Sequence, residues 1–235
     1  LAKESRHWAA PEAVVSAPPW WQSNRPQWQP QFDSIQRPQA VRALILYPLN
    51  ALVEDQLRRL RLTLNAPEVH QWLDTHRHGN RITFGRYNGQ TPVPGSFDDK
   101  GAQKRLAAWM RDLARQSHDL QALPPHKQAE IFGYFQELSG AEMLTRWDMQ
   151  HTPPDILITN YSMLNIMLMR QVEANIFEKT RQWLQSNQEH RFFLIVDELH
   201  SFRGTPGTEV SYLLRLLFQR LGLHPESPQL AILST

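Results

Sequence analysis

The sequence of 235 residues contains no cysteine. Its absence excludes disulfides, thiolate-bound zinc, iron–sulfur clusters and a cysteine nucleophile, and it fits a reducing compartment. No apolar run approaches the roughly 18 residues that a membrane-spanning helix needs. We therefore expect a cytoplasmic protein with no membrane partner.

Glycine is scarce and unevenly placed, because all ten glycines lie from Gly79 onward. A phosphate-binding loop of the Gly-x-x-x-x-Gly-Lys-Ser/Thr type needs glycines where the backbone approaches the ligand. The chain contains no such sequence and no Gly-Lys pair. Any phosphate loop of this type therefore lies outside these 235 residues.

Charge of either sign is in near balance, with 25 Lys+Arg against 23 Asp+Glu and a net charge of +2. Such a small excess is weak evidence for a polyanionic partner. The chain has no initiator methionine and stops at Thr235 within an apolar run. We expect it to be a piece of a longer polypeptide.

Residues 1–40 differ in composition from the rest, with six of the 17 prolines and four of the eight tryptophans. Because no period of 2 or 3.6 persists there, we predict a Pro/Trp-rich connector that its aromatic side chains partly pin. Residues 41–235 then form the main domain, and residues 119–152 are predicted to be a helical insertion in it.

Short apolar runs alternate with amphipathic segments along the main domain. The runs predict strands at 41–47, 81–87, 155–159, 191–196 and 229–233. Helical spacing predicts helices at 49–64, 98–118, 161–170 and 210–221. This alternation predicts an α/β fold with a parallel sheet covered on both faces. Such sheets bind ligands at the carboxyl ends of their strands.

Asp197-Glu198, at the end of the apolar run 192–196, gives the sharpest chemical signal. Adjacent carboxylates repel each other and need a cation or a shared proton. In phosphoryl-transfer sites one carboxylate holds the Mg²⁺ shell and the next orients or deprotonates the attacking water. A strand that runs into a solvated turn could give the same pair, but Leu199-His200 directly after it favours the chemical interpretation.

Several segments together resemble one family. Asp197-Glu198-Leu199-His200 is similar to motif II, the DExH or DEAH box, of superfamily 2 helicases. Tyr47–Leu52, followed by Asp55-Gln56, resembles motif Ia, and residues 154–164 resemble the motif Ib region. Ser234-Thr235 falls where motif III begins.

The Tyr-Pro-x-Asn-Ala-Leu-x-x-Asp-Gln form of motif Ia resembles one branch of that superfamily. The branch contains the bacterial YprA/MrfA proteins and the phage-defence helicases DrmA of DISARM and DruE of Druantia. Gly85–Gly89 resembles the Tyr-x-Gly segment of this branch, and Phe202-Arg203-Gly204 also matches it. The resemblance covers roughly residues 41–235 and implies a RecA-like P-loop NTPase lobe, with the phosphate loop and the second lobe outside the chain.

The resemblance also implies roles for individual residues. Asp197 would hold Mg²⁺ through water, Glu198 would act as the catalytic base, and both would contact ATP together with His200. His200, Ser234 and Thr235 would couple the ATP site to the nucleic-acid site. Contacts to a nucleic-acid strand are implied for Tyr47, Asn50, Gln56, Thr159 and Asn160.

Physical arguments support the strand contacts, because helix N-termini, amides and hydroxyls bind phosphates without reading sequence. For Thr159-Asn160, ordinary N-capping of the next helix is an equal alternative and is compatible with binding. Other polar features favour a plain interpretation. We predict a solvated loop for His70, His76 and His78. The arginines at 58, 59 and 61 are predicted to lie on a solvated helix face. The methionines at 163, 167 and 169 are predicted to pack in the core.

The sequence thus predicts a fragment of an ATP-dependent superfamily 2 DNA helicase or translocase that couples ATP hydrolysis to movement on DNA or its unwinding. Bacterial anti-phage defence is the expected setting, with single-stranded DNA, or a duplex with a single-stranded end, and other defence subunits as partners. The isolated fragment is expected to be inactive. Two alternatives remain: a DNA-repair helicase of the same branch, and a degenerate, non-hydrolysing lobe that binds DNA or protein.

Overall fold

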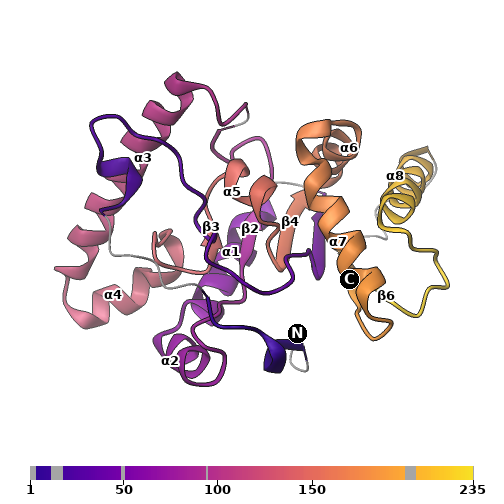
Figure 1. Cartoon of the computed structure of the whole chain (residues 1–235), viewed down its shortest axis with the longest axis horizontal. Coiled ribbons are helices and arrows are strands. Elements are labelled where there is room, and N and C mark those ends of the chain that lie inside the picture. The colour runs from indigo at the N-terminus through magenta and orange to yellow at the C-terminus, as the bar shows by residue number, and fades with distance from the viewer. Residues whose placement is uncertain (1–3, 12–17, 49–50, 94, 199–204, 235) are drawn as a thin grey trace. The chain divides into compact units, whose positions relative to one another are not determined.

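The structure is a computed structural model that describes residues 4–11, 18–48, 51–93, 95–198 and 205–234 (Figure 1). The chain divides into two compact units. The first comprises residues 1–37, 56–82 and 91–148, and the second comprises residues 38–55, 83–90 and 149–235. Over the described residues, no helix is long and apolar enough to cross a membrane.

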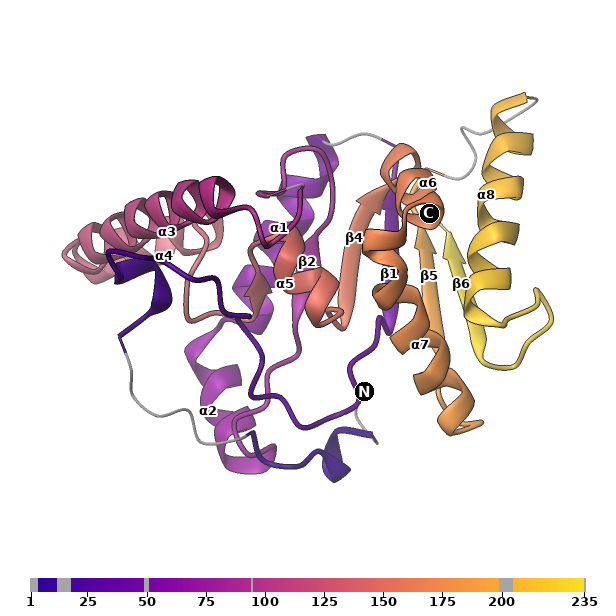
Figure 2. The same cartoon turned by 45° about the horizontal axis from the view of Figure 1, so that its top comes forward.

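The second unit is built on parallel strands. They are β1 (Ala43–Tyr47), β2 (Phe84–Arg86), β4 (Ile156–Asn160), β5 (Phe192–Val196) and β6 (Leu230–Ser234). Their order is β2-β4-β1-β5-β6, and every neighbouring pair is parallel. Figure 2 shows β4, β1, β5 and β6 side by side. The predicted α/β class with a parallel sheet is confirmed, and the predicted strands differ from the observed ones only at their ends.

Helices connect these strands. They are α6 (Tyr161–Met169), the 3₁₀ turn η4 (Gln171–Glu173), α7 (Ala174–Ser186) and α8 (Thr205–Leu221), and α1 (Ala51–Leu64) begins in this unit. α7 and α8 cover one face of the sheet, where Phe177 and Leu217 pack near Leu44 and Phe192. On the opposite face Ile158 is buried and Phe193 is 40% exposed.

A buried carboxylate, Asp155, joins the amino ends of three of these strands. It is fully buried, and its Oδ1 accepts a hydrogen bond from Arg42 Nη1 at 2.8 Å. Its Oδ2 accepts from Thr83 N at 2.8 Å and from Thr83 Oγ1 at 3.1 Å, and its main-chain oxygen accepts from Arg42 N and Ala43 N. Since Arg42 precedes β1, Thr83 precedes β2 and Asp155 precedes β4, this cluster fixes the register of the three strands.

α6 differs from its prediction as a helix buried on all sides. Leu164, Met167 and Leu168 are buried, but Met169 is 65% exposed and Ile166 is also exposed. The helix packs against β4 and α8 on one side only. The prediction that Met169 lies in the core is therefore wrong.

The first unit is mainly helical. Its elements are η1 (Glu4–His7), η2 (Trp20–Gln22), α2 (Pro67–His76), α3 (Lys100–Gln121), α4 (Pro125–Ile131), η3 (Phe132–Tyr134), the short strand β3 (Glu142–Met143) and the start of α5 (Arg146–His151). Asp99 caps α3, because its Oδ1 accepts from Gly101 N at 2.8 Å and from Ala102 N at 3.1 Å. The four elements from α4 to α5 fall within the stretch predicted to be an insertion.

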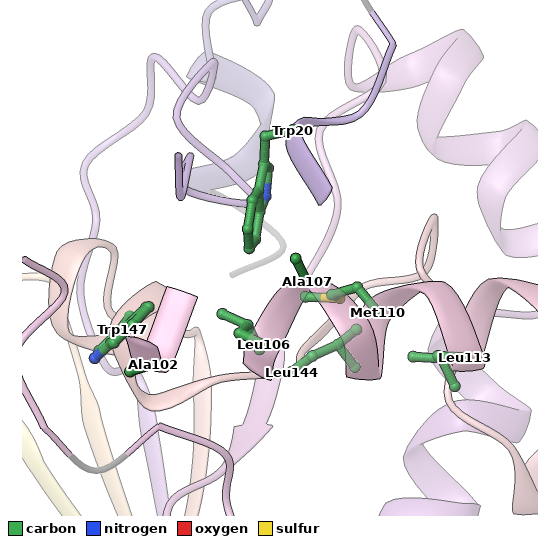
Figure 3. Packing of buried hydrophobic residues seen from close by; sticks show 8 residues of the cluster. All are labelled: Trp20, Ala102, Leu106, Ala107, Met110, Leu113, Leu144 and Trp147. Atoms are coloured by element: carbon green, nitrogen blue, oxygen red, sulfur yellow. The ribbon is translucent and has the colours of Figure 1, made fainter. Parts of the chain in front are cut away.

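The Trp-rich N-terminal segment is anchored on α3. Trp20 is only 8% exposed and belongs to a cluster with Leu106, Ala107, Met110 and Trp147. Figure 3 shows its ring directed towards Leu106 and Ala107 on α3. Trp20 therefore fixes the N-terminal segment to α3.

The arginines of α1 are not a uniformly solvated face, so that prediction is wrong for two of them. Arg61 is buried and forms a bidentate ion pair with Glu142, with Nε to Oε2 at 2.6 Å and Nη2 to Oε1 at 2.8 Å. The Arg58 guanidinium stacks over the Tyr134 ring at 4.5 Å. Arg59 is exposed, as predicted. The pattern misled because a long cationic side chain can pack beside an acidic or aromatic partner that is distant in sequence.

The histidine cluster is also not a loop. His70 and His76 lie on α2, where the His76 ring stacks on Trp72, and only His78 follows the helix, with a φ of 54°. Over the part of the chain that the structure describes, no group of three or more His, Asp or Glu could hold a metal ion.

The Asp155 cluster makes a stability prediction. Replacing Asp155 with Asn leaves the buried Arg42 guanidinium without its counter-charge, which costs about 3 to 5 kcal/mol in the free energy of unfolding. Urea unfolding of the two proteins measures this loss. Glu178→Gln, which removes an exposed carboxylate paired with Arg181, is the control and should change stability far less. Equal losses in both variants would contradict the role given to Asp155.

Asp148, in the first unit, is a buried carboxyl that holds the N-terminal segment. It accepts hydrogen bonds from Gln31 N at 3.0 Å and from Thr145 Oγ1 at 2.5 Å. Burial raises the pKa of Asp148 to about 6, although these hydrogen bonds act in the opposite direction.

This raised pKa predicts a pH dependence. Because the folded pKa lies above the unfolded value of about 3.9, the folded state retains the proton between these values. The contribution of Asp148 to stability is therefore greatest below about pH 4 and falls, by on the order of 2 to 3 kcal/mol, as the pH rises to about 6. Asp148→Asn should lose this component in urea titrations at pH 4, 5, 6 and 7, and Asp112→Asn, at an exposed site, should keep it. A pH profile unchanged in Asp148→Asn would refute the assignment.

Candidate functional site at the carboxyl ends of the strands

The strand register brings the polar strand ends together at one edge of the second unit. Tyr47 pairs with Asn160, and Val196 pairs with both Leu46 and Ser234. Asp197 continues the ladder by one bond, because its N donates to Leu46 O at 3.0 Å. The Asp197-Glu198 pair therefore leaves the sheet between the ends of β1 and β6.

The two carboxylates differ in backbone and in exposure. Asp197 is half-buried, and Glu198 is exposed with a φ of 54°. A left-handed conformation is uncommon for a residue with a long side chain and stores strain, which proteins retain mostly at functional sites. The sharp turn at Glu198 keeps both carboxylates at the tip of β5.

This donor set suits Mg²⁺. The ion prefers oxygen ligands and is usually held by one or two carboxylates, with waters and substrate phosphates completing its shell. Asp197 and Glu198 supply hard oxygen donors at a solvent-accessible edge, and the described residues offer no third carboxylate or histidine to enclose an ion completely. The pair thus fits a metal that is shared with a phosphate ligand.

Asn160 forms the N-cap of α6, as the sequence allowed. Its Oδ1 accepts a hydrogen bond from Met163 N at 2.7 Å, and its side chain is half-buried. Thr159 is fully buried, and its hydroxyl donates to Tyr87 O at 2.6 Å. Tyr47 is also buried. Burial argues against direct ligand contact by Thr159 or Tyr47, so of these three residues only Asn160 can reach a ligand at this edge.

The remaining predicted residues are distributed differently. Ser234 is exposed beside the end of β5. Gln56 is half-exposed on α1 and belongs to the first unit. Asn50, His200 and Thr235 lie outside the described residues.

Tyr161, the first residue of α6, is a site residue that the sequence did not single out. Burial, and then the negative charge of Asp197, raise the pKa of the Tyr161 phenol to about 12. The charge of Asp197 therefore acts on Tyr161, which directly follows the cap residue Asn160. An aromatic residue at the start of an apolar helix gives no sequence signal of this kind.

Arg86, at the carboxyl end of β2, is a second residue that the sequence did not single out. Its guanidinium forms an ion pair with Glu54 in the first turn of α1 and donates to Gln90 Oε1 at 3.3 Å. It is a cationic group on the same strand edge as Asn160. The sequence predicted a strand over residues 81–87 but gave no sign of the ion pair between Arg86 and Glu54.

A groove of about 1150 Å³ runs along α6 and α8. Tyr161 and Asn165 line it from α6, and Tyr212 and Leu216 line it from α8. Neither Asp197 nor Glu198 lines the groove. The groove is therefore a feature separate from the carboxylate pair.

The ordered motifs and this strand-end geometry define the class of the protein, a helicase lobe of the phage-defence and MrfA-like branch of superfamily 2. A particular relative is Druantia protein DruE from Escherichia coli (strain UMEA 4076-1). It is 34% identical over 237 residues, which cover 83% of this chain and 13% of DruE. The chain therefore spans only a small part of the length of this relative.

Other comparisons are weaker. Among solved structures, the Mycobacterium smegmatis helicase Lhr bound to ssDNA and AMP-PNP is 21% identical with a TM-score of 0.44, covering 84% of this chain and 17% of Lhr. The DUF1998 helicase MrfA is 18% identical with a TM-score of 0.37, and the match covers 83% of this chain and 19% of MrfA. At these scores neither structure can place individual residues. No protein-family model matches the chain.

The left-handed Glu198 makes a testable prediction. Asparagine tolerates positive φ better than glutamine, so Glu198→Asn should be more stable than Glu198→Gln by about 0.5 to 1 kcal/mol. Both variants remove the same charge, and thermal unfolding compares them. At Glu209, exposed on α8, the order should reverse because glutamine is the better helix former. The same order at both positions would show that Glu198 is not strained.

Proposed function

We propose that this chain is part of the first RecA-like lobe of an ATP-dependent superfamily 2 DNA helicase or translocase. The observation that carries the proposal is the Asp197-Glu198 pair at the tip of β5, one strand away from β1 and two from the Asn160-capped start of α6. Such a lobe couples ATP hydrolysis to movement on DNA. The 34% identity to DruE supports this assignment.

On the nucleotide side, Asp197 would hold Mg²⁺ through water, and Glu198 would act as the base that takes a proton from the attacking water. When bound, Mg²⁺ neutralises charge on the phosphates. The exposed Glu198 carboxylate is placed to orient a water, and the half-buried Asp197 is held by its main-chain bond to Leu46. The phosphate loop that holds ATP belongs to another part of the parent polypeptide.

On the nucleic-acid side, Asn160 and the N-terminal turn of α6 bind one nucleic-acid strand through its phosphates. Asn50 and Gln56 of the motif Ia segment add polar contacts. Tyr47 and Thr159, which are buried, support this surface from below and do not contact the strand. Binding through amides and N–H groups needs no strongly basic face, which agrees with the net charge of +2.

Coupling between the two sides runs through the edge that they share. Of the three residues proposed for coupling, Ser234 ends β6 beside Val196 of β5, and His200 and Thr235 lie outside the described residues. Tyr161 directly follows the cap residue Asn160 and responds to the charge of Asp197. A shift of α6 on strand binding would therefore be felt at Asp197.

For the parent protein we propose a role in bacterial anti-phage defence, with other defence subunits as partners and single-stranded DNA, or a duplex with a single-stranded end, as the substrate. The resemblance to the defence branch and the identity to DruE favour this role over DNA repair. The isolated chain should not hydrolyse ATP, because no phosphate loop occurs in its sequence. A degenerate lobe that only binds DNA or protein is disfavoured by the intact carboxylate pair.

Glu198→Gln in the full-length protein tests the proposal. The substitution removes the base but keeps the size and polarity of the side chain. DNA-stimulated ATP turnover should fall by at least about 10²-fold, with the affinity for an ATP analogue retained. Glu209→Gln is the control and should leave turnover unchanged. Full turnover in Glu198→Gln would exclude it as the base, and a parent protein that binds ATP without any turnover would favour the degenerate lobe.

A further inference from the structure

Tyr87, directly after β2, is the centre of a buried polar network. The residue is completely buried, and its side chain is one of the largest among the fully buried residues. Its hydroxyl donates to Glu173 Oε1 at 2.7 Å and accepts from Gln150 Nε2 at 2.7 Å. A phenol with both a donor and an acceptor partner is fixed in orientation, because each bond would be costly to lose in a buried setting.

The main chain of Tyr87 is hydrogen-bonded to the end of β4. Its N donates to Ile158 O at 2.8 Å, and its carbonyl oxygen accepts from Thr159 Oγ1 at 2.6 Å. Thr159 is the residue directly before the cap residue Asn160. The position of the β4–α6 junction is therefore set by Tyr87.

The side chain of Tyr87 is hydrogen-bonded to the segment that follows α6. Glu173, in η4, is fully buried, and its Oε2 lies 3.5 Å from Arg170 Nε at the C-cap of α6. Tyr87 therefore forms hydrogen bonds with Thr159, which precedes α6, and with Glu173, which follows it. A single buried tyrosine thus contacts the segments on both sides of α6.

We infer that Tyr87 is a positioning residue for nucleic-acid binding, which orients α6 so that Asn160 and the helix N-terminus meet the phosphates of the bound strand. The inference rests on the proposed function, since it assigns a supporting residue to the same surface. Tyr87 contacts no ligand itself because it is fully buried.

The orientation argument is physical. Phosphate binding at a helix N-terminus depends on the direction of a few N–H groups, so a small rotation of α6 weakens several hydrogen bonds at once. Removing the Tyr87 hydroxyl takes away the hydrogen-bond partner of Glu173 Oε1 and of Gln150 Nε2, while Glu173 keeps its ion pair with Arg170. Because unpaired polar groups are costly to bury, we expect the segment after α6 to shift so that water reaches them. Strand binding should therefore respond more than nucleotide binding.

The test compares Tyr87→Phe and Thr159→Val with Thr180→Val in the full-length protein. Thr180 is a matched control, because it is a buried threonine of the same unit whose hydroxyl donates to Ile176 O at 2.7 Å and accepts from Val41 N at 3.0 Å. The measurements are the affinity for a fluorescent single-stranded oligonucleotide, the affinity for an ATP analogue, and the DNA concentration that half-maximally stimulates ATP turnover.

Tyr87→Phe should weaken oligonucleotide binding and raise the half-maximal DNA concentration by about tenfold, which corresponds to about 1.4 kcal/mol. Turnover at saturating DNA and affinity for the ATP analogue should change by less than about twofold. Thr159→Val should behave similarly, and Thr159→Ser, which keeps the hydroxyl, should restore binding. Thr180→Val should lower the melting temperature without changing oligonucleotide affinity.

Two results would overturn the inference: unchanged oligonucleotide affinity in Tyr87→Phe, or an equal loss in Thr180→Val, which would mark the effect as general destabilisation. Asn160→Ala in the same assay separates this failure from that of the proposed function. If Asn160→Ala weakens binding and Tyr87→Phe does not, only the positioning role fails. If neither substitution weakens oligonucleotide binding, the proposed nucleic-acid-binding surface itself is wrong.

Discussion

The Asp155 carboxylate is the constraint on which the geometry of the second unit depends. It is fully buried and receives hydrogen bonds from Arg42, which precedes β1, and from Thr83, which precedes β2. In a parallel sheet a slip of one residue would turn every side chain to the other face. By fixing three strands at their amino ends, Asp155 determines which residues emerge together at their carboxyl ends.

The candidate site is a consequence of that register. Tyr47 and Asn160 are partners across β1 and β4, and the bond from Asp197 N to Leu46 O places the carboxylate pair beside them. Tyr161 follows Asn160 and is close enough to Asp197 for its pKa to respond to that charge. The proposed nucleotide side, at the end of β5, and the proposed nucleic-acid side, at the end of β4, thus lie at the same edge of the sheet, separated by β1.

Much of this was predictable from the sequence, because the signals were local. Apolar runs ending in Asp197, Asn160 and Tyr47 gave the strands, and alternation with helical periods gave the parallel sheet. Capping of the following helix by Asn160 was one of the two interpretations of its sequence, and Asn160 caps α6 in the structure. Motif order along the chain carried the helicase class, and the identity to DruE bears it out.

What escaped the sequence depended on partners far away along the chain. Arg61 looked like a surface residue because Glu142, its buried counter-ion, lies 81 residues away. Met169 looked like core because an apolar helix gives no sign of which side packs. The sequence also gave no sign that the Thr159 hydroxyl donates to the carbonyl of Tyr87, which belongs to another strand connection. Each error concerns a tertiary contact that local spacing does not encode.

The most direct measurement of the central claim is a structure of the full-length protein with a non-hydrolysable ATP analogue, Mg²⁺ and single-stranded DNA. The account predicts Mg²⁺ within one water of Asp197 and a DNA phosphate at Asn160 and the first turn of α6. A nucleotide bound away from the Asp197-Glu198 pair, for example in the groove between α6 and α8, would contradict it. So would a strand that passes over a different face and leaves Asn160 in contact with solvent.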